Sequence, residues 1–262
     1  MIKLNWFRVI TRLLVFAAFV VVYLIRGFYI HYRIKEPFDR KKRFARLNCW
    51  IQALCCRTFK VQIEILNAPP ANTPGLFIGN HLGFLDILSI GGSRPLLFVT
   101  SQEMRETPVL GLLTEMAGCI YVERRSRKSI HDELKNLIEA LKEGHNICLF
   151  PEATSHNGER VLPFKRTLMT AAAHANVPIF PYTLNFIEID GEPFSLKNRD
   201  LVCWYGDMPF VKALFSSLSI GQLKVQIKFH AQFDYKPEMD RAEVADHLHD
   251  VISNDFKIVS IN

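Results

Sequence analysis

One histidine lies at a spacing that suits acid–base chemistry. His81 follows the apolar stretch 75–80, and Asp86 comes five residues later. A neutral histidine is a general base near pH 7, and a carboxylate held against its ring fixes the tautomer and stabilises the imidazolium that forms. The chain contains no GxSxG turn, which would supply a serine nucleophile. We therefore expect His81 to remove a proton from the substrate itself, for instance from a hydroxyl group.

A second group of polar residues follows the apolar stretch 146–150. Glu152 and Thr154 come at the predicted exit of a strand, where side chains reach ligands in open α/β sheets. Lys165 and Arg166 are predicted to open a helix, where bases and free backbone N–H groups can hold an anion. The alternative interpretation of this segment is a solvated turn.

A third group consists of bases that follow the predicted strand 119–123. Arginine suits the geometry of a phosphate, so Arg124 and its neighbours could clamp such a group. The alternative is an ordinary solvated surface. The bases are Arg124, Arg125, Arg127 and Lys128.

The segments that must position these residues alternate between strand and helix from about residue 60. Short apolar runs predict strands at 61–66, 75–80, 96–100, 119–123, 146–150, 177–184 and 223–229. Helical periodicity predicts a helix that begins near residue 85, an apolar helical segment around 108–116, and helices over 129–143, 165–176 and 241–256. Repeated strand–helix units predict an α/β fold, a single domain with a mixed, mostly parallel sheet flanked by helices.

The N-terminal segment differs in character from the rest of the chain. Leu13–Ile25 carries no charge, and the apolar run extends to Ile30 if Arg26 is tolerated, whereas a spanning helix needs about 20 apolar residues. Arg8 and Arg12 before the run could reach lipid headgroups. We predict a membrane-anchoring helical segment over 1–58 and a second unit over 59–262. A cleaved signal peptide and a buried helix are the alternatives, although no cleavage site follows the run.

Charge is distributed unevenly along the chain. Residues 1–60 contain thirteen of the 32 Lys and Arg residues but two of the 26 acids, so the remainder is net acidic. This distribution argues against a nucleic-acid-binding protein and favours a basic arm at an anionic membrane surface. The bases after the apolar run place that side in the cytoplasm, so we expect the rest of the chain on the cytoplasmic face, at the inner membrane if the protein is bacterial.

The six cysteines indicate a reducing compartment and no metal site. They include no CxxC pair and no spacing typical of metal ligands, and we expect buried thiols. Acylation of the adjacent Cys55 or Cys56 is the alternative use of a thiol here. His247 and His249 have a spacing that suits no metal site on a helix, so none is expected.

The order of these segments resembles the glycerolipid acyltransferase family that includes lysophosphatidic acid acyltransferases. The resemblance covers about residues 60–200. Four blocks carry it in order: Asn80-His81-x4-Asp86, Gly118-Cys119-Ile120-Tyr121-Val122-Glu123-Arg124, Phe150-Pro151-Glu152-Ala153-Thr154-Ser155 and Val177-Pro178-Ile179-Phe180-Pro181.

The resemblance implies transfer of a fatty acyl group from a thioester to the free hydroxyl of a lyso-lipid. His81 would take the hydroxyl proton and Asp86 would orient His81. The thioester would be acyl-CoA or acyl-carrier protein as co-substrate, and membrane lipids would be partners; no cofactor or metal is expected. Residues implied to bind the acceptor are Asn80, Arg124, Glu152, Thr154, Lys165 and Arg166.

Two departures from the family's pattern bear on the acceptor. Ala153 stands where glycine is usual, and Ser155 stands where the family has an arginine that helps to bind the acceptor phosphate. Lysophosphatidic acid is therefore the first expected acceptor, and another lysophospholipid or an amino-acid-containing lyso-lipid is the alternative. A membrane lipid-binding protein without catalysis, and a lipid hydrolase that uses water, are the two competing functions.

Overall fold

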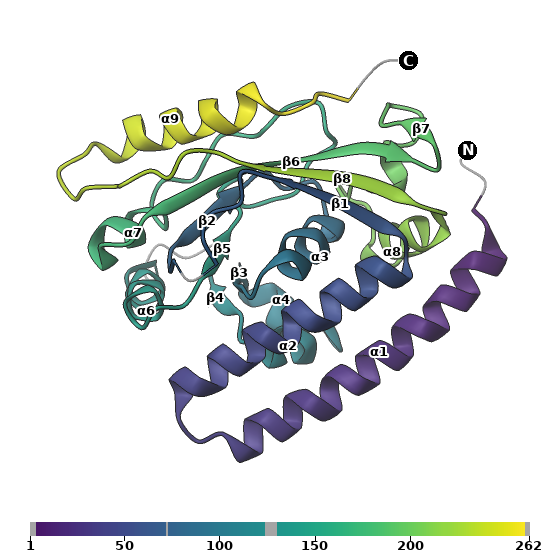
Figure 1. Cartoon of the computed structure of the whole chain (residues 1–262), viewed down its shortest axis with the longest axis horizontal. Helices are drawn as coiled ribbons and strands as arrows, with labels where there is room; N and C mark the ends of the chain where they lie inside the picture. Colours follow the sequence, from purple (N-terminus) through teal and green to yellow (C-terminus); the bar gives the residue numbers. More distant parts are fainter. Residues whose placement is uncertain (1–3, 72, 124–129, 260–262) are drawn as a thin grey trace.

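Short strands rich in β-branched and aromatic residues pair into one sheet (Figure 1). The computed structural model describes residues 4–71, 73–123 and 130–259. The strand order is β1-β8-β6-β2-β5-β3-β4, and β7 pairs with β6. The strands are β1 (Val61–Leu66), β2 (Leu76–Gly79), β3 (Leu97–Ser101), β4 (Ile120–Val122), β5 (Ile147–Leu149), β6 (Ile179–Ile189), β7 (Glu192–Pro193) and β8 (Leu223–Phe229).

The sheet is mixed and mostly parallel, as the sequence predicted. β6 pairs antiparallel with β8 and β7, whereas every other neighbouring pair of strands is parallel. The four residues of β2 and the three of β5 are all buried, because helices cover both faces at the centre of the sheet. β8 alternates buried and half-buried residues, as its sequence pattern predicted.

Helices cover the sheet on two sides. In Figure 1, α9 lies along β6 on one side, and α1 and α2 lie side by side on the other, with α3 between α2 and the sheet. The helices are α1 (Trp6–Arg33), α2 (Pro37–Thr58), α3 (Phe84–Ser93), α4 (Gln102–Glu106), α5 (Leu110–Met116), α6 (Ile130–Lys142), α7 (Thr170–Ala175), α8 (Phe210–Ser219) and α9 (Arg241–Asn254), with a 3-10 turn η1 (Arg199–Leu201).

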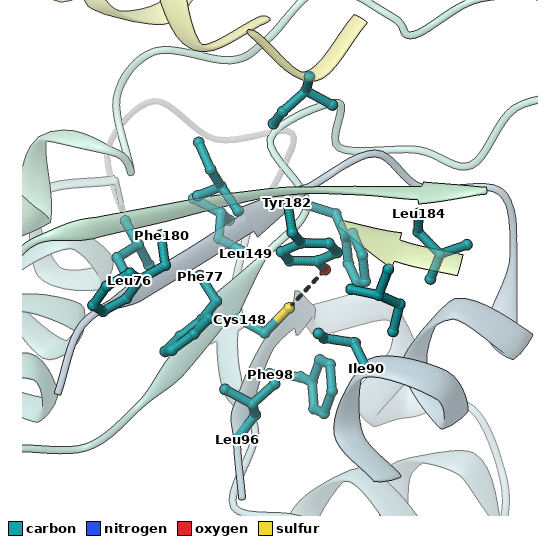
Figure 2. Packing of buried hydrophobic residues seen from close by; sticks show 14 of the residues in the cluster. Leu76, Phe77, Ile90, Leu96, Phe98, Cys148, Leu149, Phe180, Tyr182 and Leu184 are labelled. Atoms are coloured by element: carbon teal, nitrogen blue, oxygen red, sulfur yellow. Dashed lines mark hydrogen bonds between the residues drawn. The ribbon is translucent and has the colours of Figure 1, made fainter. Parts of the chain in front are cut away.

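The core lies where the central strands meet α3. Figure 2 shows Tyr182 of β6 and Cys148 of β5 meeting under the sheet, where the Tyr182 hydroxyl and the Cys148 Sγ are 3.3 Å apart. Phe77 stacks on Phe180, with ring centroids 4.9 Å apart. This packing fixes the ends of β2 and β5, and those ends carry the polar residues of interest.

α1 is long and apolar enough to cross a membrane. Of the residues in its most apolar 18-residue stretch, 11% are buried in the protein. Its first turns are nevertheless bound to the sheet domain. Arg8 Nη1 donates to the Ser219 carbonyl at 2.9 Å, and Arg12 Nη2 donates to the Phe59 and Gly221 carbonyls, both at 3.0 Å. The side chains of these two arginines, expected to reach lipid headgroups, are thus bonded to backbone carbonyl groups of the protein.

Two other elements differ from the sequence-based expectation. The helix predicted over 165–176 begins at Thr170, because residues 161–166 run without helical structure and bury Val161 and Phe164. α8 forms where no element was predicted.

Candidate active site

The turn between β2 and α3 places His81 against Asp86. Asp86 is the third residue of α3, and its Oδ2 accepts the Leu82 and Gly83 backbone N–H groups that precede the helix. The same Oδ2 lies 2.9 Å from His81 Nδ1. A carboxylate at the start of a helix is stabilised by the free N–H groups there. The cap of α3 therefore also positions the partner of the histidine.

The His81 ring is fixed in orientation and remains accessible. It stacks on Phe150, with ring centroids 4.2 Å apart, and its side chain is 17% exposed while Asp86 is fully buried. Because Asp86 accepts at Nδ1, the proton of the neutral ring sits on Nδ1, and Nε2 is left with a lone pair that can take a proton. This arrangement is that of a general base.

Asn80, expected to contact substrate, is buried and bonded to the backbone of β6. Its Nδ2 donates to the Leu184 carbonyl at 2.9 Å, and its Oδ1 accepts the Leu184 N–H at 2.8 Å. The side chain thereby takes the place of a strand partner where β2 ends. Both polar atoms of Asn80 thus tie the His81 turn to β6, and a contact between Asn80 and substrate stays a prediction.

Glu152 holds the backbone of His81 from the other side. Its Oε1 accepts the His81 N–H at 2.6 Å, and its Oε2 accepts the Leu162 N–H at 2.6 Å. The carboxylate is buried, and burial outweighs these two donors and raises the pKa of Glu152 to about 8. Glu152 therefore supports the catalytic turn and does not face the cavity.

His156 also contacts this turn, and no sequence pattern predicted this contact. Its backbone N–H donates to the His81 carbonyl at 3.1 Å, and its Nδ1 accepts the Gly158 N–H. His156 Nε2 lies 3.3 Å from Glu152 Oε2, and burial lowers the pKa of His156 to about 4. No motif marks such a residue, because its role rests on backbone contacts.

A cavity of about 630 Å³ is lined by His81 and by residues of α1, α2, α3 and α5. Most of its lining residues are apolar, and Thr154, Ser155 and the loop 204–208 also line it. The apolar lining residues include Phe16, Phe19, Val20, Tyr23, Ile51, Cys55, Phe84, Ile87, Leu88, Phe98, Leu110, Leu113, Ala117 and Leu214.

Of the basic residues expected at the site, the two that the structure describes do not line this cavity. Thr154 lines it as expected, whereas Lys165 and Arg166 are exposed and are not among the residues that line it. Arg166 instead lowers the pKa of Asp240, the cap of α9, although backbone hydrogen bonds lower it more. Arg124 lies outside the described residues, as do the bases that follow it.

Among the described residues, no three His, Cys, Asp or Glu side chains gather in a way that could hold a metal ion. All six cysteines are free thiols. Burial raises the pKa of Cys55 and Cys56 to about 12, so neither is a nucleophile near neutral pH. The lack of a metal or cofactor stays a prediction.

Comparison with known proteins gives related sequences and one shared fold. Residues 60–185 match the protein family described as Acyltransferase. A lyso-ornithine lipid O-acyltransferase of Rhizobium meliloti is 27% identical over 73% of this chain and 68% of its own length. A 1-acyl-sn-glycerol-3-phosphate acyltransferase of Neisseria gonorrhoeae is 26% identical over 73% of each chain. The crystal structure of the 1-acyl-sn-glycerophosphate acyltransferase of Thermotoga maritima has the same fold, with a TM-score of 0.66 at 19% identity over 94% of this chain and 95% of that one.

Proposed function

Since the chain belongs to the acyltransferase family through residues 60–185, we propose that it transfers a fatty acyl group from a thioester to the free hydroxyl of a lyso-lipid. The resemblance seen in the sequence is confirmed, and the chain is an O-acyltransferase of lipid biosynthesis. The similar proteins act on lysophosphatidic acid or on lyso-ornithine lipid, the two kinds of acceptor that the sequence left open.

The observation that carries this proposal is the position of the His81–Asp86 pair. A general base lines a cavity whose lining residues are mostly apolar. A base in such a place meets the polar end of a lipid while the hydrocarbon enters the protein. Neither a nucleophilic serine nor an exposed thiol is required.

Proton transfer then follows from the geometry. His81 Nε2 takes the proton of the acceptor hydroxyl as its oxygen attacks the thioester carbonyl carbon. Asp86 stabilises the imidazolium that forms. The C–S bond breaks as the tetrahedral intermediate collapses, and the imidazolium returns its proton to the departing thiolate. The products are the acylated lipid and a free thiol, and no covalent enzyme intermediate forms.

The apolar part of the cavity is suited to the acyl chain. Helices α1, α2, α3 and α5 contribute aliphatic and aromatic side chains to it, with few polar atoms. Burial of each methylene stabilises the bound chain by about 0.8 kcal/mol. The acyl chain therefore provides much of the donor's affinity, whether the thiol belongs to coenzyme A or to a carrier protein.

The protein works at a membrane, and we propose that α1 lies in one leaflet of the bilayer. Arg8 and Arg12 fasten its start to the sheet domain, and Phe16, Phe19 and Tyr23 line the cavity, so this helix cannot leave the domain without opening the site. The basic residues of α2 favour the cytoplasmic face. The division of the chain into a membrane-anchoring segment, 1–58, and an acyltransferase domain, 59–262, stays a proposal. Its boundary coincides with the end of α2 at Thr58.

The proposed function is tested with purified protein in detergent. A labelled acyl-CoA or acyl-carrier protein is offered with lysophosphatidic acid, with other lysophospholipids, and with lyso-ornithine lipid. We expect acylated product with at least one acceptor. Product with none of them would overturn the proposal, and release of fatty acid without any acceptor would indicate a hydrolase instead.

A further inference from the structure

The described residues that line the cavity include one carboxylate and no lysine or arginine. The single carboxylate there is Asp207, in the loop 204–208 between η1 and α8. Asp207 is exposed and makes no hydrogen bond or ion pair within the described part of the chain. Its charge is therefore available to a ligand.

The loop 204–208 is held firmly beside the catalytic turn. The Trp204 N–H donates to the Leu82 carbonyl at 2.8 Å, one residue from His81. Trp204 Nε1 donates to the Met208 carbonyl at 2.7 Å and closes the loop across Asp207. Gly206 has a φ of +58°, a conformation that glycine adopts without strain.

Ser155 joins this loop to the segment after β5. Its Oγ donates to the Trp204 carbonyl, so its hydroxyl is used within the protein. Ser155 stands where the resembling family has an arginine for the acceptor phosphate. A side chain added at Gly83 would lie 3.0 Å from the Val202 carbonyl oxygen and 3.2 Å from the Trp204 nitrogen, so glycine allows this close approach. Ser155 and the loop with Asp207 are thus in direct contact.

The neighbouring base, Arg199, is already used. Its Nη1 lies 2.6 Å from Glu159 Oε1, its Nε lies 3.8 Å from Asp200 Oδ1, and its guanidinium lies over the Tyr205 ring. Arg199 is not among the residues that line the cavity. Arg199 is therefore paired with its own partners, and no other lysine or arginine of the described residues lines the cavity beside Asp207.

We propose that Asp207 is a specificity-determining residue that selects lyso-lipids with a protonated amine in the polar group. A phosphate monoester carries a charge of about −1.5 to −2 at neutral pH and would be repelled by Asp207, whereas an ammonium group would be attracted. The inference rests on the proposed function, because it concerns the acceptor of that same reaction.

The test compares Asp207→Asn and Asp207→Lys with the wild type. The acceptors are lyso-ornithine lipid, lysophosphatidylethanolamine and lysophosphatidic acid, at a fixed concentration of labelled acyl-CoA. For Asp207→Asn we expect about a tenfold rise in KM for the amine-bearing acceptors, with kcat and the KM of acyl-CoA unchanged. Asp207→Lys should also lower the KM of lysophosphatidic acid. The two amine acceptors separate an amino-acid headgroup from an ethanolamine phosphate.

The matched control is Asp246→Asn, an exposed aspartate on α9 that does not line the cavity. It should leave every KM unchanged. Wild-type preference for lysophosphatidic acid, or Asp207 variants with unaltered acceptor preference, would overturn the inference while the proposed function stands. Absence of transfer by the wild type to every acceptor would instead overturn the proposed function.

Discussion

At the scale of single residues, His81 is held by its own turn and by the segment 150–156. Asp86 contacts the ring at Nδ1, Phe150 stacks on the ring, and Glu152 and His156 bond the backbone on either side of it. Catalytic groups act best when neighbours fix their orientation before substrate binds. These contacts fix His81 without using its Nε2.

Glu152 should make stability depend on pH. The unfolded chain loses this proton near pH 4.5, whereas the folded protein keeps it to about pH 8, so the folded state binds more protons in between. The free energy of unfolding should therefore fall as pH rises through this range. His156 has the opposite effect between about pH 4 and 6.5, so Glu152 acts alone above pH 6.5. Urea unfolding should show a loss of about 2 kcal/mol between pH 6.5 and 8.

Glu152→Gln is the control for this prediction, because glutamine does not titrate. The variant should be less stable overall, since its amide N–H₂ faces a backbone donor, but its unfolding free energy should stay level between pH 6.5 and 8. An equal slope in both proteins would show that Glu152 is not the group responsible.

Ala153 is strained, and its replacement by glycine should be tolerated. Its φ is +60°, in the left-handed region that costs an L-residue about 1–2 kcal/mol. Glycine relieves that cost but loses more entropy on folding. We expect Ala153→Gly to raise the free energy of unfolding by up to about 1 kcal/mol, measured by thermal melting. Ala242→Gly on α9 should instead lower it by about 0.5–1 kcal/mol; a similar loss at Ala153 would contradict the assignment of strain.

The sequence predicted the His81–Asp86 pair because both residues belong to one turn, where spacing determines distance. It did not predict the surroundings of Asn80, Lys165 and Arg166, since these depend on segments distant along the chain. Leu184, which pairs with Asn80, is 104 residues away. Asp207 was missed for the same reason, because only the fold brings its loop to the cavity.

At the scale of elements, helix α5 should limit the length of the acyl chain. Ala117 follows α5 and lines the cavity, so a leucine there would fill part of the inner space. We expect Ala117→Leu to lower kcat/KM for long acyl donors at least about tenfold while shorter donors are used nearly as well. The dependence of kcat/KM on acyl-chain length is measured with a series of acyl-CoA donors of increasing chain length. Ala242→Leu, outside the cavity, should leave the profile unchanged, and an unchanged profile for Ala117→Leu would contradict the placement of the acyl chain.

Helices and strands whose apolar residues recur at a regular spacing were predicted well, whereas segments without such a spacing were not. β1, β8, α6 and α9 follow their apolar patterns within a few residues. The segment before α7 misled the prediction, because the Lys165 N–H donates to the Pro151 carbonyl and holds the chain outside a helix. Such contacts override local propensity and leave no local pattern.

At the scale of the whole molecule, the exposed side of α1 should bind the membrane. Leu14 is 67% exposed and Ile25 is 64% exposed, which is costly for large apolar side chains in water. Arg26 lies over the Trp50 ring at 4.4 Å, so a base and an aromatic residue meet on this side as they do at lipid interfaces. Residues of α1 form part of this surface and part of the cavity lining. Membrane binding through α1 would therefore bring the lipid to the site.

Replacing Leu14 and Ile25 together by glutamate should abolish binding to anionic vesicles. The charged side chains would remove the apolar surface and add repulsion from the lipid headgroups. Co-sedimentation with vesicles measures the bound fraction. Leu196→Glu, at an exposed position outside α1, is the control and should bind as the wild type does. Undiminished binding of the double variant would rule out α1 as the contact.

The most direct test of the central claim is acyl transfer by His81→Ala. With a labelled acyl thioester and the acceptor that the wild type uses best, we predict a loss of at least about 10³-fold in rate. The circular dichroism spectrum and vesicle binding should match those of the wild type, because His81 contributes little to the core. A rate within tenfold of the wild type, in a protein that folds and binds vesicles normally, would contradict the assignment of His81 as the base.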